Sequence, residues 1–122
     1  MPRFGEHIRR RRESLRRSDP QFSVRRVARR IGVEPSYLSK VERDLEAPPS
    51  EAKIQSLALV LGEDADALLA LAGKVASDLT EAIRRRPHVF PRVIRQLKDL
   101  PDRQLLRAPQ AARSSADPKE SP

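Results

Sequence analysis

Residues 23–43 hold two short amphipathic helical patterns that meet at one glycine, Gly32. Before the glycine, apolar residues recur at the i, i+3, i+4 and i+7 positions of one helix face, and they are Val24, Val27, Ala28 and Ile31. After it, the pattern continues at i, i+3 and i+7 with Leu38, Val41 and Leu45. Because glycine can adopt the left-handed backbone that a sharp corner needs, this stretch predicts two helices joined by a tight turn.

Helical spacing of apolar residues also marks the sequence on both sides of this stretch, whereas the alternation typical of β-strands is absent. We therefore predict an all-α fold. The helices expected in the first part of the chain span about residues 4–17, 24–31, 35–43, 51–61 and 66–72. Ser23 is the expected N-cap of the second helix, and Glu34 and Pro35 are the expected cap and first residue of the third.

The chain continues with a shorter helical extension. Residues 74–107 contain two further apolar patterns, which are too short to form stable helices alone and must pack on the preceding helices or on a second copy. Residues 108–122 consist mainly of proline, alanine, serine and mixed charges. We predict that this tail is disordered, because such a composition cannot bury a core.

The positive charge of the chain is concentrated in its first half. The formal net charge is +8, and residues 1–50 hold 13 Lys and Arg against 7 Asp and Glu. A basic half of this kind fits a polyanionic partner, although solvated helix faces rich in arginine give the same composition. Two short helices around a tight turn, in so basic a chain, indicate a helix-turn-helix whose second helix enters the major groove of DNA.

Several classes of site are not expected from this sequence. Cysteine is absent, and the two isolated histidines, His7 and His88, cannot form a metal centre alone. Paired carboxylates, a nucleophile elbow and a glycine-rich phosphate loop are also missing, so we expect no metal, no cofactor and no enzymatic activity. We further expect a soluble, cytoplasmic protein without a membrane partner, because neither a signal peptide nor a spanning apolar run is found.

A longer series of residues supports the helix-turn-helix interpretation. In chain order it comprises Phe4-Gly5, Ile8-Arg9, Ser23, Val27-Ala28, Ile31-Gly32-Val33, Tyr37-Leu38-Ser39, Glu42, Pro49-Ser50, Leu57-Ala58 and Leu61-Gly62. With these residues at this spacing, the sequence resembles the Cro/repressor-type (XRE-like) helix-turn-helix family of bacterial and phage transcriptional regulators over about residues 4–72. It departs from the family in the longer Arg16–Gln21 connection and at Asp44, where the family often has glycine.

The resemblance implies a five-helix, repressor-like DNA-binding domain over residues 1–73, with residues 35–43 as the recognition helix. The residues it assigns to reading base edges are Glu34, Pro35, Ser36, Ser39 and Lys40. Ser36 and Lys40 are four residues apart and share one helix face, and Lys40 can donate to O6 or N7 of guanine. The alternative is that these polar residues form an ordinary solvated face.

Other residues are assigned to the DNA backbone or to the structure. Those expected to contact phosphates are Ser23, Val24, Arg25, Arg26, Tyr37 and Arg43. Val24 stands where the family often has glutamine, and for Arg25 and Arg26 a solvated surface is the alternative. The resemblance also implies a structural ion pair between Arg12 and Glu42, which joins the first and third helices.

From these roles we expect a transcriptional regulator, by default a repressor, that binds a palindromic operator of double-stranded DNA as a homodimer. Residues 74–107 are the expected dimerisation segment, and its apolar surface comprises Leu79, Ile83, Phe90, Ile94 and Leu97. One alternative is an antitoxin-type protein that autoregulates its operon and binds a toxin through its C-terminal segment. Another is a regulator with an effector pocket in the same segment. The sequence leaves the role of the basic run at 84–86 open.

Overall fold

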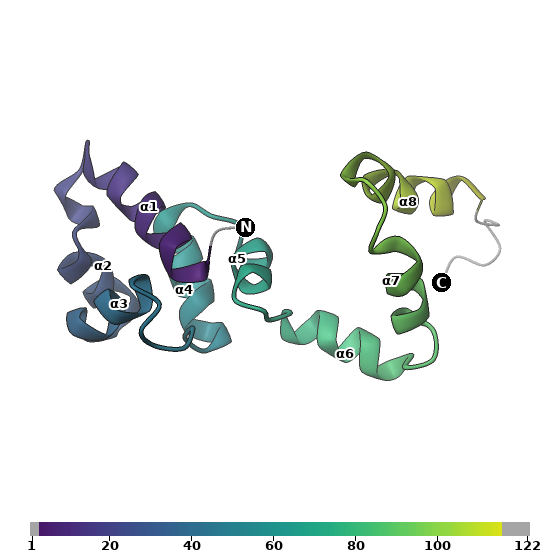
Figure 1. Cartoon of the computed structure of the whole chain (residues 1–122), viewed down its shortest axis with the longest axis horizontal. Coiled ribbons are helices and arrows are strands. Elements are labelled where there is room, and N and C mark those ends of the chain that lie inside the picture. Colours follow the sequence, from purple (N-terminus) through teal and green to yellow (C-terminus); the bar gives the residue numbers. More distant parts are fainter. Residues whose placement is uncertain (1–2, 116–122) are drawn as a thin grey trace. The chain divides into compact units, whose positions relative to one another are not determined.

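The computed structural model describes residues 3–115, and these residues form helices and loops without a strand (Figure 1). The α-helices are α1 (Phe4–Arg16), α2 (Val24–Ile31), α3 (Pro35–Glu42), α4 (Glu51–Leu61), α5 (Ala65–Leu71), α6 (Ser77–Arg85), α7 (Phe90–Leu97) and α8 (Asp102–Ser115), and a 3-10 turn spans Pro20–Phe22. The predicted all-α fold is confirmed. The chain divides into two compact units between Leu79 and Thr80, and each is described by itself.

The first unit packs α1 to α5 around one apolar core. Each of these helices contributes the residues of its apolar stripe. The largest fully buried side chains are Ile8, Leu38, Ile54, Leu57, Leu61, Leu68, Leu69, Val27 and Val41. Because α2 packs against both α3 and α4, the core holds the helix-turn-helix in one geometry and leaves the polar faces of α2 and α3 outside.

Local side-chain signals set the ends of these helices. The side chains of Ser23, Ser50 and Asp64 each accept a hydrogen bond from a backbone N–H in the first turn of α2, α4 and α5. Glu34 occupies the same N-cap position of α3 but makes no such bond. At the other end of α2, Gly32 has φ +76°, the left-handed conformation predicted for the tight turn.

A close backbone approach joins the start of α1 to the end of α3. A Cβ atom at Gly5 would lie 2.2 Å from the carbonyl oxygen of Val41, so only glycine fits there. The backbone N–H of Gly5 donates to Oδ1 of Asp44 at 3.2 Å. Asp44 has φ +58°, a left-handed conformation that favours glycine. Its carboxylate accepts a hydrogen bond in the first turn of α1, which offsets the strain of an aspartate at this position.

Leu45 lies beyond the end of α3, as the predicted end of this helix near residue 43 implies. Leu45 continues the apolar spacing of Leu38 and Val41 in the sequence, but its exposed fraction is 64%. The helix ends at Glu42 and the backbone then reverses through the left-handed Asp44, so Leu45 no longer follows the face of α3.

The C-terminal part differs from the prediction in two respects. The first unit extends past the expected boundary at residue 73, because Ala76 is buried and the Ser77 hydroxyl donates to the carboxylate of Glu51. Helix α8 continues through Pro109 to Ser115, so residues 108–115 of the expected disordered tail are helical. The alanines, glutamine and arginine of this segment favour helix. Residues 116–122 lie outside the described residues.

The second unit contains most of α6 together with α7 and α8. Pro91 lies in the first turn of α7, where the absent N–H would have no helical partner. Within residues 3–115, no helix combines the length and the apolar composition that a membrane-spanning segment requires.

Candidate nucleic-acid interface

The outer face of α3 is open to solvent. Ser36 and Lys40 are exposed, while Leu38 and Val41, on the opposite side of the helix, are each 1% exposed. Glu34 before the helix is exposed, and Pro35 and Ser39 are half-buried. The structure therefore brings the five residues predicted to read bases to one accessible end and side of α3.

The N-terminus of α2 provides a second group of polar atoms. Ser23 Oγ accepts from the N–H of Arg26 at 3.3 Å, and the side chains of Arg25 and Arg26 are exposed. Val24 packs against the core with a partly buried side chain. Val24 can offer a phosphate only its backbone N–H, whereas Arg25 and Arg26 carry exposed positive charge.

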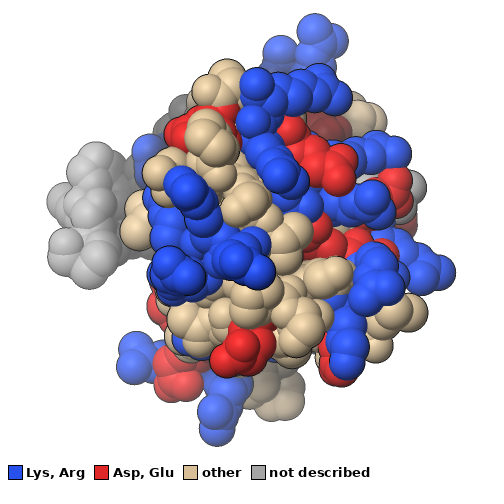
Figure 2. Space-filling view, turned by 90° about the vertical axis from the view of Figure 1, so that its left-hand side faces the viewer, with Lys and Arg blue, Asp and Glu red and all other residues tan. Residues whose placement is uncertain are grey.

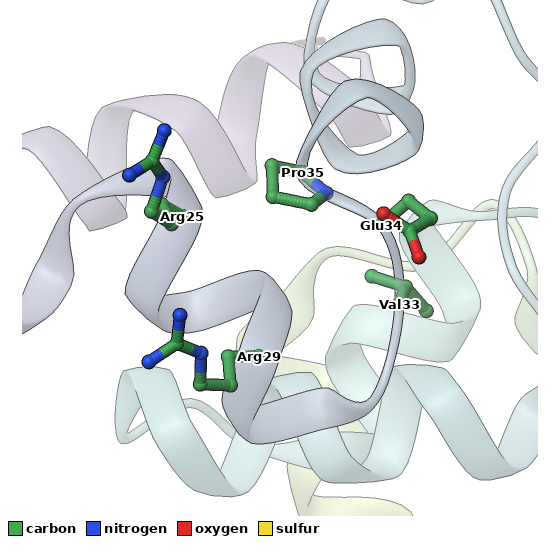
Figure 3. Close-up of a pocket in the computed structure, with 5 residues that line it drawn as sticks. All are labelled: Arg25, Arg29, Val33, Glu34 and Pro35. Atoms are coloured by element: carbon green, nitrogen blue, oxygen red, sulfur yellow. The ribbon is translucent and has the colours of Figure 1, made fainter.

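Two hollows flank these helices. The first, of about 330 Å³, lies between α2 and the turn that enters α3, and its lining residues are Arg25, Arg29, Val33, Glu34 and Pro35 (Figure 3). The second, of about 200 Å³, lies between α1, the start of α2 and α3, and its lining residues are Arg9, Arg12, Glu13, Val24, Ser39, Glu42 and Arg43. Each hollow carries arginine beside the exposed face of α3, as a surface that receives a phosphate backbone requires.

Two arginines of these hollows are not among the residues predicted from the sequence to contact DNA. Arg29 lines the first hollow beside Arg25, and Arg9 lines the second beside Arg12. The spacing of Arg25 and Arg29, one helical turn apart, is a signal that could have identified Arg29. Arg9 has no comparable signal, because its place depends on how α1 packs across α3.

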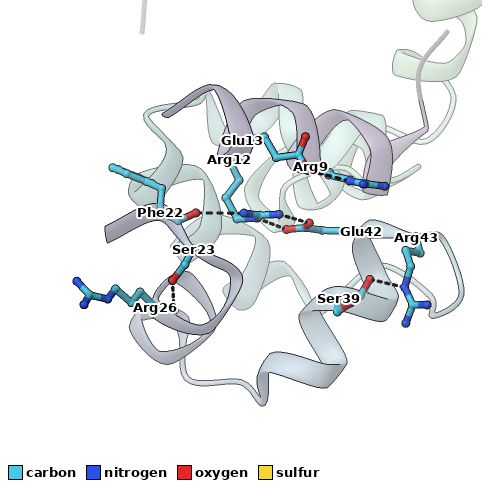
Figure 4. Close-up of polar contacts among 9 residues, drawn as sticks. All are labelled: Arg9, Arg12, Glu13, Phe22, Ser23, Arg26, Ser39, Glu42 and Arg43. Carbon is cyan, nitrogen blue, oxygen red and sulfur yellow. Dashed lines mark hydrogen bonds and ion pairs between the residues drawn. The ribbon is translucent and has the colours of Figure 1, made fainter. Parts of the chain in front are cut away.

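Arg12 and Glu42 form a buried ion pair beneath the interface (Figure 4). Arg12 donates to both carboxylate oxygens of Glu42, from Nε at 2.7 Å and from Nη2 at 2.9 Å. Its Nη1 also donates to the carbonyl oxygen of Phe22 at 3.2 Å. The exposed fractions are 4% for Arg12 and 6% for Glu42. The pair thus neutralises an acidic residue of α3 and ties together α1, α3 and the turn before α2.

The last two residues predicted to contact phosphates are Tyr37, within α3, and Arg43, at its C-terminal end. Tyr37 is partly buried against the core. Arg43 is exposed and its Nε donates to the carbonyl oxygen of Ser39 at 3.4 Å, which holds the side chain along the helix (Figure 4). Arg43 therefore presents its guanidinium at the rim of the second hollow.

Positive charge is spread over this end of the molecule. Figure 2 shows many Lys and Arg side chains on the side that carries α2 and α3, with a smaller number of acidic residues between them. On α1, the carboxylate of Glu13 is paired with Arg9 at 3.1 Å. Pairing lowers the repulsion that the acids would exert on a polyanion.

The residues predicted for dimerisation show mixed exposure. Leu79, which closes the first unit, is 46% exposed. In the second unit, Ile94 is 48% exposed, and the remaining three predicted residues are half-buried, namely Ile83, Phe90 and Leu97. Val89 and Val93 add exposed apolar area to the second unit. Both units therefore carry apolar side chains that their own packing does not cover.

A family model described as "Helix-turn-helix domain" matches residues 3–71. No curated protein matches the chain. Among solved structures, the chain is similar to one titled "SinR protein/SinI protein complex", with 22% sequence identity, a TM-score of 0.49, and coverage of 93% of this chain and 99% of that chain. The family match spans α1 to α5 and includes every residue that lines the two hollows.

Proposed function

Since the chain belongs to the helix-turn-helix domain family and is a DNA-binding transcriptional regulator, we propose that it is a repressor that binds a palindromic operator as a homodimer. The observation that carries this proposal is the exposed face of α3 between two arginine-lined hollows. A helix that buries one face in the core and exposes the other, with arginines on both sides, fits the major groove and the phosphates that border it.

In this proposal α3 enters the major groove by its N-terminal end. The side chains that reach base edges are Glu34, Pro35, Ser36, Ser39 and Lys40. Lys40 supplies the strongest donor, which favours guanine, whereas the serine hydroxyls can donate or accept and discriminate less. Pro35 lacks an N–H and can only contact a thymine methyl group or fix the entry of the helix.

Phosphate contacts position α3 on the duplex. We assign them to Ser23 and the first N–H groups of α2, to the side chains of Arg25 and Arg26, and to Tyr37 and Arg43 on the other flank. Each phosphate that is neutralised releases counterions, so these contacts add affinity that salt removes and that does not depend on sequence.

Dimerisation is assigned to the exposed apolar side chains of residues 74–107. One recognition helix reads only a few base pairs, and a second copy doubles the contacts by binding a half-site about 34–36 Å away. The test is sedimentation analysis of Ile94→Asp, which should shift the chain toward monomer. Leu59→Asp is the matched control, because Leu59 is 84% exposed and lies on α4, outside the proposed interface.

A second candidate function rests on the same exposed apolar residues. In an antitoxin-type protein they would bind a different protein, and DNA binding would serve autoregulation. Sedimentation distinguishes the two, since a chain that stays monomeric at all concentrations, with and without operator DNA, would favour a different partner over a second copy.

Random-site selection with the full chain tests the proposal as a whole. It should enrich a palindrome whose half-site centres are about 34–36 Å apart. Enrichment of a single half-site would refute the dimer, and recovery of unselected sequences would refute specific recognition.

A further inference from the structure

Among α1 to α5, two N-cap residues have side chains that accept no backbone N–H of the helix they precede, namely Arg3 before α1 and Glu34 before α3. The N-cap residues of α2, α4 and α5 are Ser23, Ser50 and Asp64, and each uses its side chain to accept a backbone N–H. Glu34 holds the N-cap position of α3, but its side chain accepts no hydrogen bond from a backbone N–H of α3. Glutamate is not among the residues preferred there, and a serine would stabilise the helix more. The residue before the recognition helix thus carries a carboxylate that does not cap the helix.

The carboxylate of Glu34 is also free of ion pairs within residues 3–115, although it lines the first hollow with Arg25 and Arg29 (Figure 3). Other acids near the interface are engaged, since Glu42 pairs with Arg12 and Glu13 with Arg9. Glu34 is exposed, so its carboxylate stays accessible to a ligand. The two arginines across the hollow offset its repulsion of phosphate.

A carboxylate can only accept hydrogen bonds, which limits the bases it can contact in the major groove. Guanine presents the acceptors O6 and N7, and thymine presents the acceptor O4 and a methyl group. Adenine presents its N6 donor beside the acceptor N7. Cytosine presents the N4 donor as its one hydrogen-bonding group in this groove.

We infer that Glu34 is a specificity-determining residue that selects cytosine, through a hydrogen bond from the N4 amino group to its carboxylate. This inference rests on the proposed function, in which Glu34 reaches a base edge, and adds which base Glu34 selects. Arg25 and Arg29 hold the neighbouring phosphates, which lets an acid approach the duplex. Replacing the cytosine weakens binding by about 5- to 150-fold for each half-site.

Competition binding with the full chain tests this inference. The duplexes are the selected operator and its variants, with each of the four bases placed at each half-site position. Wild type should require cytosine at one position of each half-site. Glu34→Gln should move that preference to adenine, because an amide pairs with N6 and N7 together. Glu34→Ser should lose the preference and keep the fold, because its hydroxyl can cap α3.

Asp66→Asn is the matched control, since it removes one exposed carboxylate from α5 and should leave every preference unchanged. If Glu34→Gln and Glu34→Ser keep the base ranking of wild type, or only tighten binding to all duplexes alike, Glu34 does not read a base and the inference is overturned while the proposed function stands. Equal binding of wild type to all duplexes would overturn both.

Discussion

Substitution of Glu42 by glutamine should destabilise the first unit strongly. The change keeps the shape of the side chain but leaves the Arg12 guanidinium, 4% exposed, without its countercharge. In glutamine an NH2 group replaces one of the two oxygens that accept at 2.7 and 2.9 Å, so one hydrogen bond is lost and two donors face each other. Breaking a buried pair by removing one partner costs about 3–5 kcal/mol. We expect the lower end, about 3 kcal/mol, because one hydrogen bond can survive.

Thermal unfolding followed by circular dichroism measures this loss. For a domain of about 60–100 residues, 1 kcal/mol shifts Tm by roughly 4–8 °C, so Glu42→Gln should lower Tm by roughly 12–24 °C. Glu13→Gln is the control, since it breaks the exposed pair with Arg9 and should cost at most about 1 kcal/mol. The double variant Arg12→Met with Glu42→Leu should recover most of the stability, because it removes both charges and restores apolar volume.

The reasoning would be refuted if Glu42→Gln lowered Tm no more than Glu13→Gln. It would also be refuted if the double variant were less stable than Glu42→Gln. Either result would mean that burial does not make this pair different from a surface one.

Three further predictions follow from the interface and its supports. Lys40→Ala should change the preferred base at one position of each half-site, measured by fluorescence anisotropy with operator variants. In the same assay, Arg25→Ala should weaken binding to all sequences alike and reduce the slope of log K against log salt by about one. Gly5→Ala should lower the free energy of unfolding in urea by about 3 kcal/mol, because the new Cβ meets the Val41 carbonyl oxygen. Gly73→Ala is the control: it has open space around it and φ +74°, so it should cost only about 1 kcal/mol of backbone strain. Ser23→Ala should cost about 1 kcal/mol by removing the cap of α2, and an unchanged Tm would show that the hydroxyl is dispensable.

The parts of the fold that could be predicted have local causes. Ser23 caps the helix that follows it, Gly32 supplies the left-handed turn and Pro35 starts the next helix, so each signal lies within a few residues of its effect. The accessible face of α3 follows from the same periodicity, since burial of Leu38 leaves Lys40 outside. The resemblance to helix-turn-helix regulators is confirmed by the family match over residues 3–71.

Features that depend on contacts between distant residues could not be predicted from periodicity. The requirement for Gly5 arises from the carbonyl oxygen of Val41, and the place of Arg9 beside α3 arises from how α1 crosses it. The pairing of Arg12 with Glu42, 30 residues apart, was available only from the family resemblance.

The central claim is that the face of α3 and the start of α2 together receive duplex DNA. It is tested most directly by titrating the isotope-labelled full chain with operator DNA and following the backbone amide resonances by NMR. We predict that the largest shifts fall at Ser23–Arg26 and Ser36–Lys40, with small changes in α5. Large shifts in α5 or α8, with both of these segments unchanged at saturation, would contradict the account.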